Sequence, residues 1–430
     1  MLYVTLLSTR AINIASGLLC LTIVAGAYDS FSAGRIYTLL SLAGAATLFE
    51  LGLSTLVLQR ASQVTREESW NQVDPTQSHT LITPFLGHYL VLICVQALLL
   101  LVVLLPVGLW VIVGVFKEPL AGLGVFAWVG ACLVMALGLP TALLLSTLEG
   151  LGQLAVVAKV RAVQALASLL ALNLALFWGI GYLAIAIQLA CALAVGWLAL
   201  WTLHGPFVKL ILQHVRLQLV KARVKLDWPF QWRLSLSFLS GYFSNQAWVV
   251  AISLTGAVAL AGHVAMTLQV LTAMVGFAIT PIAARLASLS ALARPDSCND
   301  YHRLVFLLIR QTGLLFLSML GVSAIGYASA DFFIPEIKSK LLQAGPLIVI
   351  VLCAPLVLSL AALTLLNQSL GRDDLYFVSV FRIIAPLSVL AIFRNDLDAW
   401  SFSLSFAAIV LVSVLAGLKI HSYSLMRHLA

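Results

Sequence analysis

The chain has 430 residues, of which 62% are hydrophobic and only 9% are charged. Because a soluble domain carries about 25% charged residues, this composition excludes a soluble globular protein and indicates that lipid covers most of the surface. Backbone polar groups must be paired in lipid, so spans are helices or barrel strands. Long apolar runs such as 89–116 favour helices. We attribute the formal net charge of +8 to basic residues facing the cytoplasm, and not to nucleic-acid binding.

Twelve apolar segments are long enough to cross a bilayer core of about 30 Å, which takes about 20 helical residues. The first segment lacks a basic leader and a small-residue cleavage site, so we expect a retained span and not a signal peptide. The sequence therefore predicts an all-α polytopic membrane protein. Its spans are expected near residues 5–27, 36–58, 87–114, 121–147, 160–178, 181–203, 233–255, 260–284, 304–328, 343–366, 375–393 and 400–420.

The basic residues predict the orientation of these spans. With the N-terminus inside, the cytoplasmic connections hold 16 of the 24 lysines and arginines, and the outer connections hold five. The remaining three, Arg10, Arg310 and Arg382, lie within spans. Because cytoplasmic connections carry an excess of basic residues, we expect both termini in the cytoplasm.

The longest connection, residues 204–232, joins spans six and seven and mixes apolar residues with five basic ones. This pattern predicts an amphipathic helix on the inner leaflet, with a plain basic loop as the alternative. The connection divides the chain into an N-terminal six-helix lobe (1–203), a basic linker (204–232) and a C-terminal six-helix lobe (233–430).

The two halves contain similar short segments. Ala33-Gly34-Arg35 opens span two, and Ala261-Gly262-His263 opens span eight. Both spans end at a basic residue, Arg60 and Arg285. Six spans per half predict two parallel repeats, as in transporters with two lobes. Chance similarity between apolar helices is the alternative.

The sequence lacks the common motifs of nucleotide binding, metal binding and hydrolysis. It contains no GxxxxGK[ST], HExxH or GxSxG motif. Its six cysteines are scattered without a CxxC pair, which disfavours a zinc site or a disulfide framework. The largest outer connection, near 329–342, is too short for a domain that holds an acceptor. We therefore expect no enzyme activity, no metal and no cofactor.

Polar residues inside spans are costly in hydrocarbon and are candidates for function. In span one, Asn13 shares a helix face with Thr9 and Ser16, and Arg10 lies beside this face. Arg10 either binds substrate or extends to the inner headgroups. The polar residues of span seven either line a cavity or bond a neighbouring helix; they are Ser240, Ser244, Asn245 and Gln246.

Glu50 is the one acidic residue well inside a predicted span. It either forms a structural ion pair with a basic residue, which we favour, or binds a proton or a sodium ion. Further candidates for substrate binding lie closer to span ends, where extension to the headgroups is the alternative; they are Arg35, His263, Arg285 and Arg310. Arg382 in span eleven is explained in the same way.

The segment from Phe31 to Arg60 resembles the second span of Wzx-type polysaccharide flippases. In that family a glycine and a tyrosine open the span, as Gly34 and Tyr37 do, and Glu50-Leu51-Gly52-Leu53 matches its close. A second similar segment is Leu148-Glu149-Gly150-Leu151-Gly152-Gln153. The twelve-span layout agrees along the whole chain, and multidrug exporters of the same superfamily share it.

The resemblance implies a flippase of the bacterial inner membrane, which moves an undecaprenyl-diphosphate-linked oligosaccharide, such as an O-antigen unit, to the outer leaflet by alternating access. It also implies two six-helix bundles around a central cavity lined by spans one, two, seven and eight. The implied partners are the lipid-linked substrate, the lipid bilayer, a polysaccharide polymerase and a chain-length regulator. Transport would be driven by protons, sodium ions or the membrane potential.

Two other functions stay open. A cation-coupled drug or solute antiporter of the same fold needs an ionisable acid, and Glu50 is the residue that qualifies. A membrane polysaccharide polymerase or ligase is disfavoured by the short outer connections. The scarcity of acidic residues, 16 against 24 lysines and arginines, favours an anionic substrate over a cationic drug.

Overall fold

The structure is a computed structural model. It describes Ile12, Gly17, Leu289, Leu292 and residues 19–67, 75–213, 217–286, 298–333, 335–369, 375–393 and 398–429. Within these ranges all regular elements are helices and no strand occurs, so the all-α prediction is confirmed. The chain divides into two compact units, which are not contiguous halves. The first unit comprises Met1–Asn13 and Leu42–Phe238, and the second unit comprises Ile14–Ser41 and Leu239–Ala430.

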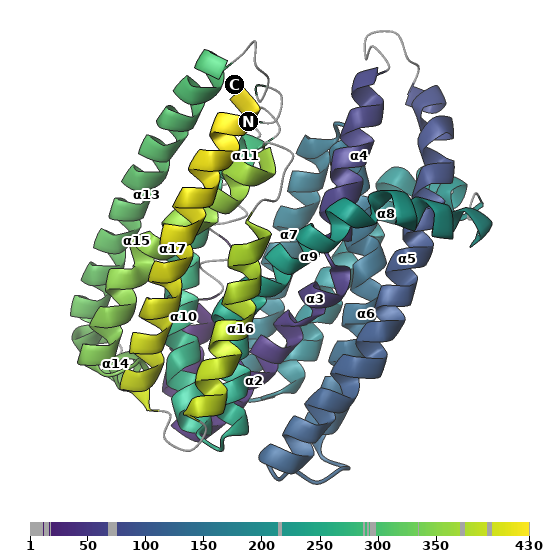
Figure 1. The fold of residues 1–430 in the computed structure, drawn as a ribbon. Coiled ribbons are helices and arrows are strands. Elements are labelled where there is room, and N and C mark those ends of the chain that lie inside the picture. The colour runs from purple at the N-terminus through teal and green to yellow at the C-terminus, as the bar shows by residue number, and fades with distance from the viewer. Residues whose placement is uncertain are drawn as a thin grey trace. The chain divides into compact units, whose positions relative to one another are not determined.

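The first unit is built around α6 (Leu123–Gly150), which packs against five other helices. Figure 1 shows α6 running beside α5, and the indole of its buried Trp128 donates a hydrogen bond to the carbonyl oxygen of Leu105 in α5 over 3.2 Å. The other helices of this unit are α3 (Ala46–Glu50), α4 (Leu53–Glu67), α5 (Pro75–Trp110), the π-helix η1 (Val111–Val115), α7 (Leu154–Phe177), α8 (Leu183–Gln213) and the first part of α9 (Leu217–Leu254).

In the second unit, α10 (Val258–Ala278) lies in the interior, whereas α15 (Ala344–Ser369) buries one side only. α10 packs against α13 and α15, and α15 packs against α17. The other elements of this unit are most of α2 (Ser30–Gly44), the second part of α9, α11 (Thr280–Ala284), α13 (Cys298–Phe333), α14 (Pro335–Lys340), α16 (Tyr376–Ile392) and α17 (Ala399–Leu429).

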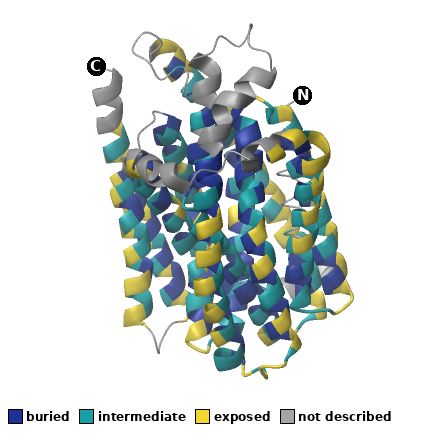
Figure 2. Cartoon of the chain, turned by 90° about the vertical axis from the view of Figure 1, so that its right-hand side faces the viewer, coloured by how far each residue is buried: buried dark blue, intermediate teal, exposed yellow. Residues whose placement is uncertain are grey.

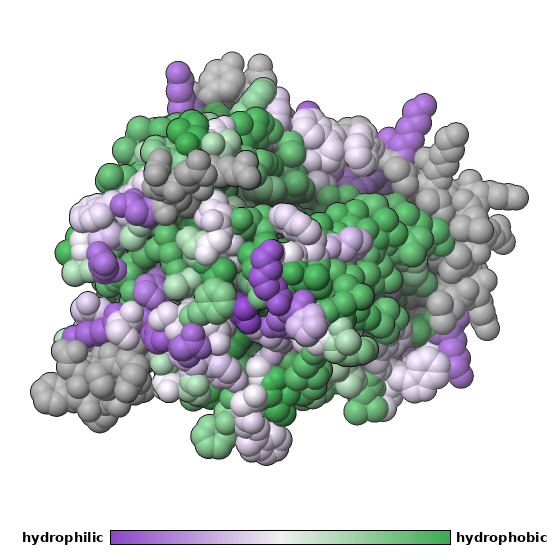
Figure 3. Space-filling view, turned by 90° about the horizontal axis from the view of Figure 1, so that it is seen from below, coloured by the Kyte–Doolittle hydropathy of each residue, from purple (hydrophilic) through white to green (hydrophobic). Residues whose placement is uncertain are grey.

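Among the described residues, eight helices are long and apolar enough to cross a membrane. They bury one side and leave large apolar side chains exposed on the other, as Leu98, Phe126 and Leu352 illustrate. Figure 2 shows buried and exposed residues alternating along single helices, and Figure 3 shows apolar side chains over much of the face that it presents. Water does not tolerate so much apolar surface on a monomer, so these helices are surrounded by lipid and the polytopic prediction is confirmed.

Predicted span two is not one continuous helix. α3 ends at Glu50, and Leu51 and Gly52 take left-handed backbone conformations, with φ of 50° and 69°, before α4 begins. Gly52 adopts this region without steric cost, whereas Leu51 does so at a cost of about 1–2 kcal/mol. The hydroxyl of Ser235 donates a hydrogen bond to the freed carbonyl oxygen of Leu51 over 2.9 Å.

Predicted span eight is also interrupted. α10 ends at Ala278, and α11 begins at Thr280 with Pro281 at its start. Proline is favoured in the first turn of a helix because its missing N–H would be unpaired there anyway. The two spans that begin with similar sequences are therefore both divided into shorter helices.

The linker is helical in all its described residues, but it is not a separate element. α8 passes through a kink at His204, where φ is −135°, and continues to Gln213. α9 then begins at Leu217 and runs without a break into predicted span seven. Figure 1 shows the chain near the end of α8 lying across α5, which it contacts.

The two glycines of the similar segments meet in the second unit. A Cβ added to Gly262 of α10 would lie 3.0 Å from the Cα of Gly34 in α2. A Cβ added to Gly34 would collide with the carbonyl oxygen of Val258. Small residues allow membrane helices to approach closely enough for backbone contact. The similar positions Gly34 and Gly262 thus form a close helix crossing.

Candidate functional site

The polar residues predicted in span seven lie on α9. Ser240 and Ser244 are buried, Asn245 is half-buried and Gln246 is exposed. The hydroxyl of Ser244 donates to the carbonyl oxygen of Ser240 over 2.6 Å, and the amide of Asn245 donates to the carbonyl oxygen of Gly241 over 3.2 Å. Ser244 therefore gives its single proton to its own helix and keeps its oxygen lone pairs as acceptors.

Arg382 of α16 uses one of these lone pairs. Its Nε–H donates to Ser244 Oγ over 2.9 Å, which continues the chain of donors to the carbonyl oxygen of Ser240. The guanidinium is half-buried, and no described residue accepts a hydrogen bond or ion pair from its two Nη groups. This arrangement fixes the side chain through a neutral hydroxyl and leaves its terminal nitrogens, with the positive charge, available to an anion.

Sequence reasoning did not select Arg382, because an arginine one to two turns inside a span is also explained by extension to the headgroups. The serines on one face of span seven could have pointed to Arg382, because their hydroxyl oxygens can accept a hydrogen bond from a side chain of another helix. We define Arg382, Ser244 and Ser240 as the arginine–serine site.

The other predicted residues of the second unit have different surroundings. The guanidinium of Arg35 lies over the ring of Phe31, 4.3 Å from its centroid. The Nε2 atom of His263 is buried and has no hydrogen-bond partner among the described residues. Arg285, which follows α11, and Arg310 of α13 are exposed. Within the described residues, the side chains of His263, Arg285 and Arg310 make no hydrogen bond or ion pair with the arginine–serine site.

Arg10 and Asn13 lie outside the described residues. Glu50, at the end of α3, is half-buried, and it makes no hydrogen bond or ion pair with a described residue. The expectation that a basic residue pairs with Glu50 stays a prediction, because candidate partners such as Arg10 lie outside the described residues. The left-handed break directly follows Glu50 and places it at a helix end, and Arg60 pairs with Asp227.

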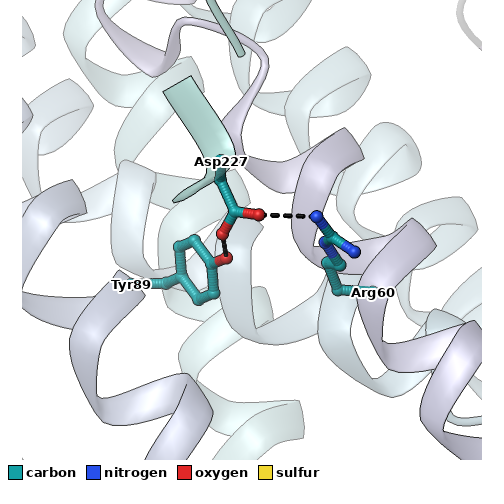
Figure 4. Close-up of polar contacts among 3 residues, drawn as sticks. All are labelled: Arg60, Tyr89 and Asp227. Atoms are coloured by element: carbon teal, nitrogen blue, oxygen red, sulfur yellow. Dashed lines mark hydrogen bonds and ion pairs between the residues drawn. The ribbon is translucent and has the colours of Figure 1, made fainter. Parts of the chain in front are cut away.

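A second polar cluster lies in the first unit and joins α4, α5 and α9 (Figure 4). Arg60 Nη2 lies 2.7 Å from Asp227 Oδ1, and the hydroxyl of Tyr89 donates to Asp227 Oδ2. The Asp227 carboxylate is 1% exposed, whereas Arg60 is 33% exposed. We call these three residues the Asp227 cluster. Its chemistry is structural: a buried carboxylate holds three helices through charge-assisted bonds.

One feature of the sequence points to the Asp227 cluster, although Asp227 is not among the candidate residues selected from the sequence. Asp227 is the single acidic residue of the linker 204–232, which otherwise carries basic residues. A lone carboxylate in a basic segment next to an apolar span needs a cationic partner if it is buried. Arg60, at the end of predicted span two, is that partner.

The second family-like segment forms the turn between α6 and α7. Glu149 Oε2 lies 2.9 Å from Arg161 Nη2, and these side chains are 18% and 42% exposed. A Cβ added to Gly150 would lie 2.6 Å from the carbonyl oxygen of Leu58 in α4. Since Leu58 belongs to the segment Phe31–Arg60, the two segments that carry the resemblance are in close contact at this turn.

No protein-family model and no curated protein matches the sequence. Among solved structures, a multidrug resistance MATE family transporter of the MOP superfamily in its inward-facing conformation is similar, with a TM-score of 0.64, 12% identity and coverage of 98% of this chain and 96% of that chain. The outward-facing conformation of such a transporter gives a TM-score of 0.63 and 12% identity, and covers 99% of this chain and 94% of that chain.

A MOP superfamily transporter from Pyrococcus furiosus is also similar, with a TM-score of 0.52, 11% identity and coverage of 98% of this chain and 94% of that chain. The reverse polarity of its binding pocket is described as suggesting a different function. At these identities the likeness concerns the fold and not the substrate. The chain is a polytopic membrane protein with the fold of MATE-type transporters of the MOP superfamily.

Proposed function

We propose that the protein is a transporter that moves an anionic, lipid-linked oligosaccharide across the membrane by alternating access. The observation that carries this proposal is the arginine–serine site: a half-buried guanidinium held by a hydroxyl and not by a carboxylate. The likeness to transporters solved in inward- and outward-facing conformations supports transport over catalysis.

The charge of Arg382 favours an anion. A carboxylate partner would neutralise the guanidinium, whereas Ser244 only orients it, and no carboxylate of the described residues pairs with it. A half-buried cation without a counter-ion is costly, and a diphosphate supplies both charge and acceptors. The planar fork of arginine binds two phosphate oxygens at once, which the ammonium of lysine cannot do. Each such bond contributes about 1.5–3 kcal/mol.

Substitution of Arg382 tests this role. Arg382→Ala should insert normally but bind and move substrate at least about ten-fold less well, since about 1.4 kcal/mol is a factor of ten. Arg382→Lys should restore part of the activity, and Ser244→Ala should reduce it because the fork is no longer oriented. The readout is surface polysaccharide in a deletion strain, together with lipid-linked units that accumulate on the inner leaflet. Lys419→Ala is the matched control, since Lys419 is exposed on α17.

Full restoration of surface polysaccharide by a well-expressed Arg382→Ala variant would overturn the role of Arg382. Normal polysaccharide in the deletion strain itself would overturn the substrate class. Arg10 in span one stays a sequence-based proposal for a second contact to the diphosphate.

A cation-coupled antiporter of drugs or small solutes is the second candidate, and Glu50 is the observation that favours it. A half-buried carboxylate without a described partner can take up a proton or a sodium ion. Glu50→Gln would then abolish drug resistance that depends on a proton or sodium gradient. In the flippase this variant should leave polysaccharide export unchanged unless the same gradient drives it.

The proposed setting is a bacterial inner membrane with both termini in the cytoplasm, as the basic residues predict. The proposed partners are the lipid-linked substrate, the bilayer, a polysaccharide polymerase and a chain-length regulator. The driving force would be a proton gradient, a sodium gradient or the membrane potential.

A further inference from the structure

Helix α13 packs against its own unit through one narrow stripe. Tyr301, Leu308, Thr312 and Phe316 are its buried side chains, at spacings of seven, four and four residues. These spacings place them on one helix face. Because α13 contacts α10, α11 and α14, this face is the one that holds α13 in the second unit (Figure 1).

The opposite face of α13 carries two arginines in an apolar surface. Arg310 follows Tyr301 by nine residues, which is two and a half turns, so it points away from the buried stripe. Arg303 lies two turns before Arg310 and shares its direction. The two arginines are surrounded by exposed apolar side chains, namely Phe306 (69% exposed), Leu314 (60%) and Leu317 (63%).

Both arginines keep their charge available. Neither Arg303 nor Arg310 makes a hydrogen bond or an ion pair with a described residue. Asp300 precedes Arg303 by three residues, and these two side chains form no ion pair. The exposed amide of Gln311 adds a further donor next to Arg310. Since seven helical residues span about 10.5 Å, two long arginine side chains can approach one phosphate between them.

The positions of Arg303 and Arg310 along α13 indicate their depth in the membrane. The candidate span of α13 runs from Asn299 to Ser329, which is longer than a bilayer core needs. About 20 residues counted back from Ser329 reach Arg310. Arg310 is therefore at the edge of the hydrocarbon core, where phospholipid headgroups begin. Leu314 and Leu317 lie on the hydrocarbon side of it and Arg303 lies on the water side.

We propose that this face of α13 binds one anionic phospholipid, with its phosphate between Arg303 and Arg310 and an acyl chain along Leu314 and Leu317. A zwitterionic lipid offers the same phosphate but brings its own cation, which the two guanidinium groups repel. The site therefore selects lipids with net negative charge. With the orientation that the basic residues predict, this lipid belongs to the inner leaflet.

Lipid retention by the purified full chain tests the proposal. Native mass spectrometry in detergent, with added phosphatidylglycerol or phosphatidylcholine, should detect one retained phosphatidylglycerol per chain and no comparable phosphatidylcholine. Arg303→Ala/Arg310→Ala should lower the retained fraction at least about ten-fold, since two charge-assisted contacts are lost. Arg303→Lys/Arg310→Lys should keep most of it. Lys225→Ala/Lys419→Ala, which removes two exposed cations elsewhere, should match the wild type.

Equal retention by the double alanine variant and the wild type would overturn the proposal. Displacement of phosphatidylglycerol by millimolar inorganic phosphate would indicate a site for free anions and would also overturn it. A loss of self-association in the double alanine variant, with lipid retention unchanged, would assign the face to a second copy of the chain. Thermal unfolding of each variant separates these results from misfolding, because exposed side chains contribute little to the fold.

Discussion

The Asp227 cluster allows a quantitative prediction about stability. Arg60→Ala leaves a carboxylate that is 1% exposed with Tyr89 as its remaining donor in the cluster. Removing one partner of a buried ion pair costs about 3–5 kcal/mol. Arg60 is 33% exposed, so water weakens the pair and we expect the lower value, about 3 kcal/mol.

The other two residues of the cluster should follow in a fixed order. Tyr89→Phe removes one hydrogen bond to a charged acceptor and should cost about 2 kcal/mol. Asp227→Asn should cost about 1–2 kcal/mol, because the partly exposed Arg60 can turn toward water and the amide still accepts one bond. The double variant Arg60→Ala/Asp227→Asn should be less destabilised than the sum of its parts by at least about 1 kcal/mol.

Unfolding of the purified chain in one detergent, titrated with dodecyl sulfate and followed by tryptophan fluorescence, measures these differences. Arg161→Ala is the matched control, because its pair with Glu149 is more exposed and should be worth about 1 kcal/mol or less. The reasoning fails if Arg60→Ala is no more destabilising than Arg161→Ala, or if the double-variant cycle is additive.

Two further predictions concern a helix crossing and a helix end. Gly34→Leu should prevent the close approach of α2 to Gly262 and markedly lower the thermal unfolding temperature in detergent. Gly26→Leu is the control and should be neutral, since nothing lies within 4 Å of a Cβ added there. Equal unfolding temperatures of the two variants would contradict the crossing. Asp398 accepts a hydrogen bond from the N–H of Ser401 over 2.8 Å, and this bond lowers the pKa of Asp398. A lowered folded-state pKa adds stability above the unfolded-state value of about 3.9, which is lost as the pH falls through the folded-state value. The start of α17 should therefore loosen only below about pH 4, and Asp398→Ala should remove that dependence in hydrogen exchange measured between pH 3 and pH 6.

The sequence predicted the long helices of this fold well. Segments such as 87–114 and 121–147 are almost entirely apolar, and α5 with η1 and α6 occupy them. Hydrophobicity over 20 residues is a strong signal, because the bilayer leaves few alternatives. The similar glycine segments were also informative, since Gly34 and Gly262 prove to be in contact.

The details that the sequence did not reveal depend on partners far away in the chain. A lone acid such as Asp227 was visible, but nothing local indicated that Arg60 and Tyr89 would reach it. In the same way, Ser244 was selected for its helix face, while its partner Arg382 lies 138 residues later. Periodicity identifies the face of a helix that is polar, but it does not identify the helix that packs against that face.

The break after α3 has a consequence for motion. Ser235 Oγ lies 2.9 Å from the carbonyl oxygen of Leu51 and 2.7 Å from that of Gln231 in its own helix. A hydroxyl has one proton and therefore saturates one of these acceptors at a time. Rotation of a single C–O bond thus exchanges α9's internal hydrogen bond for a tether to the strained Leu51. The left-handed backbone at Leu51 therefore gains or loses its hydrogen bond from Ser235 on the timescale of a side-chain rotation.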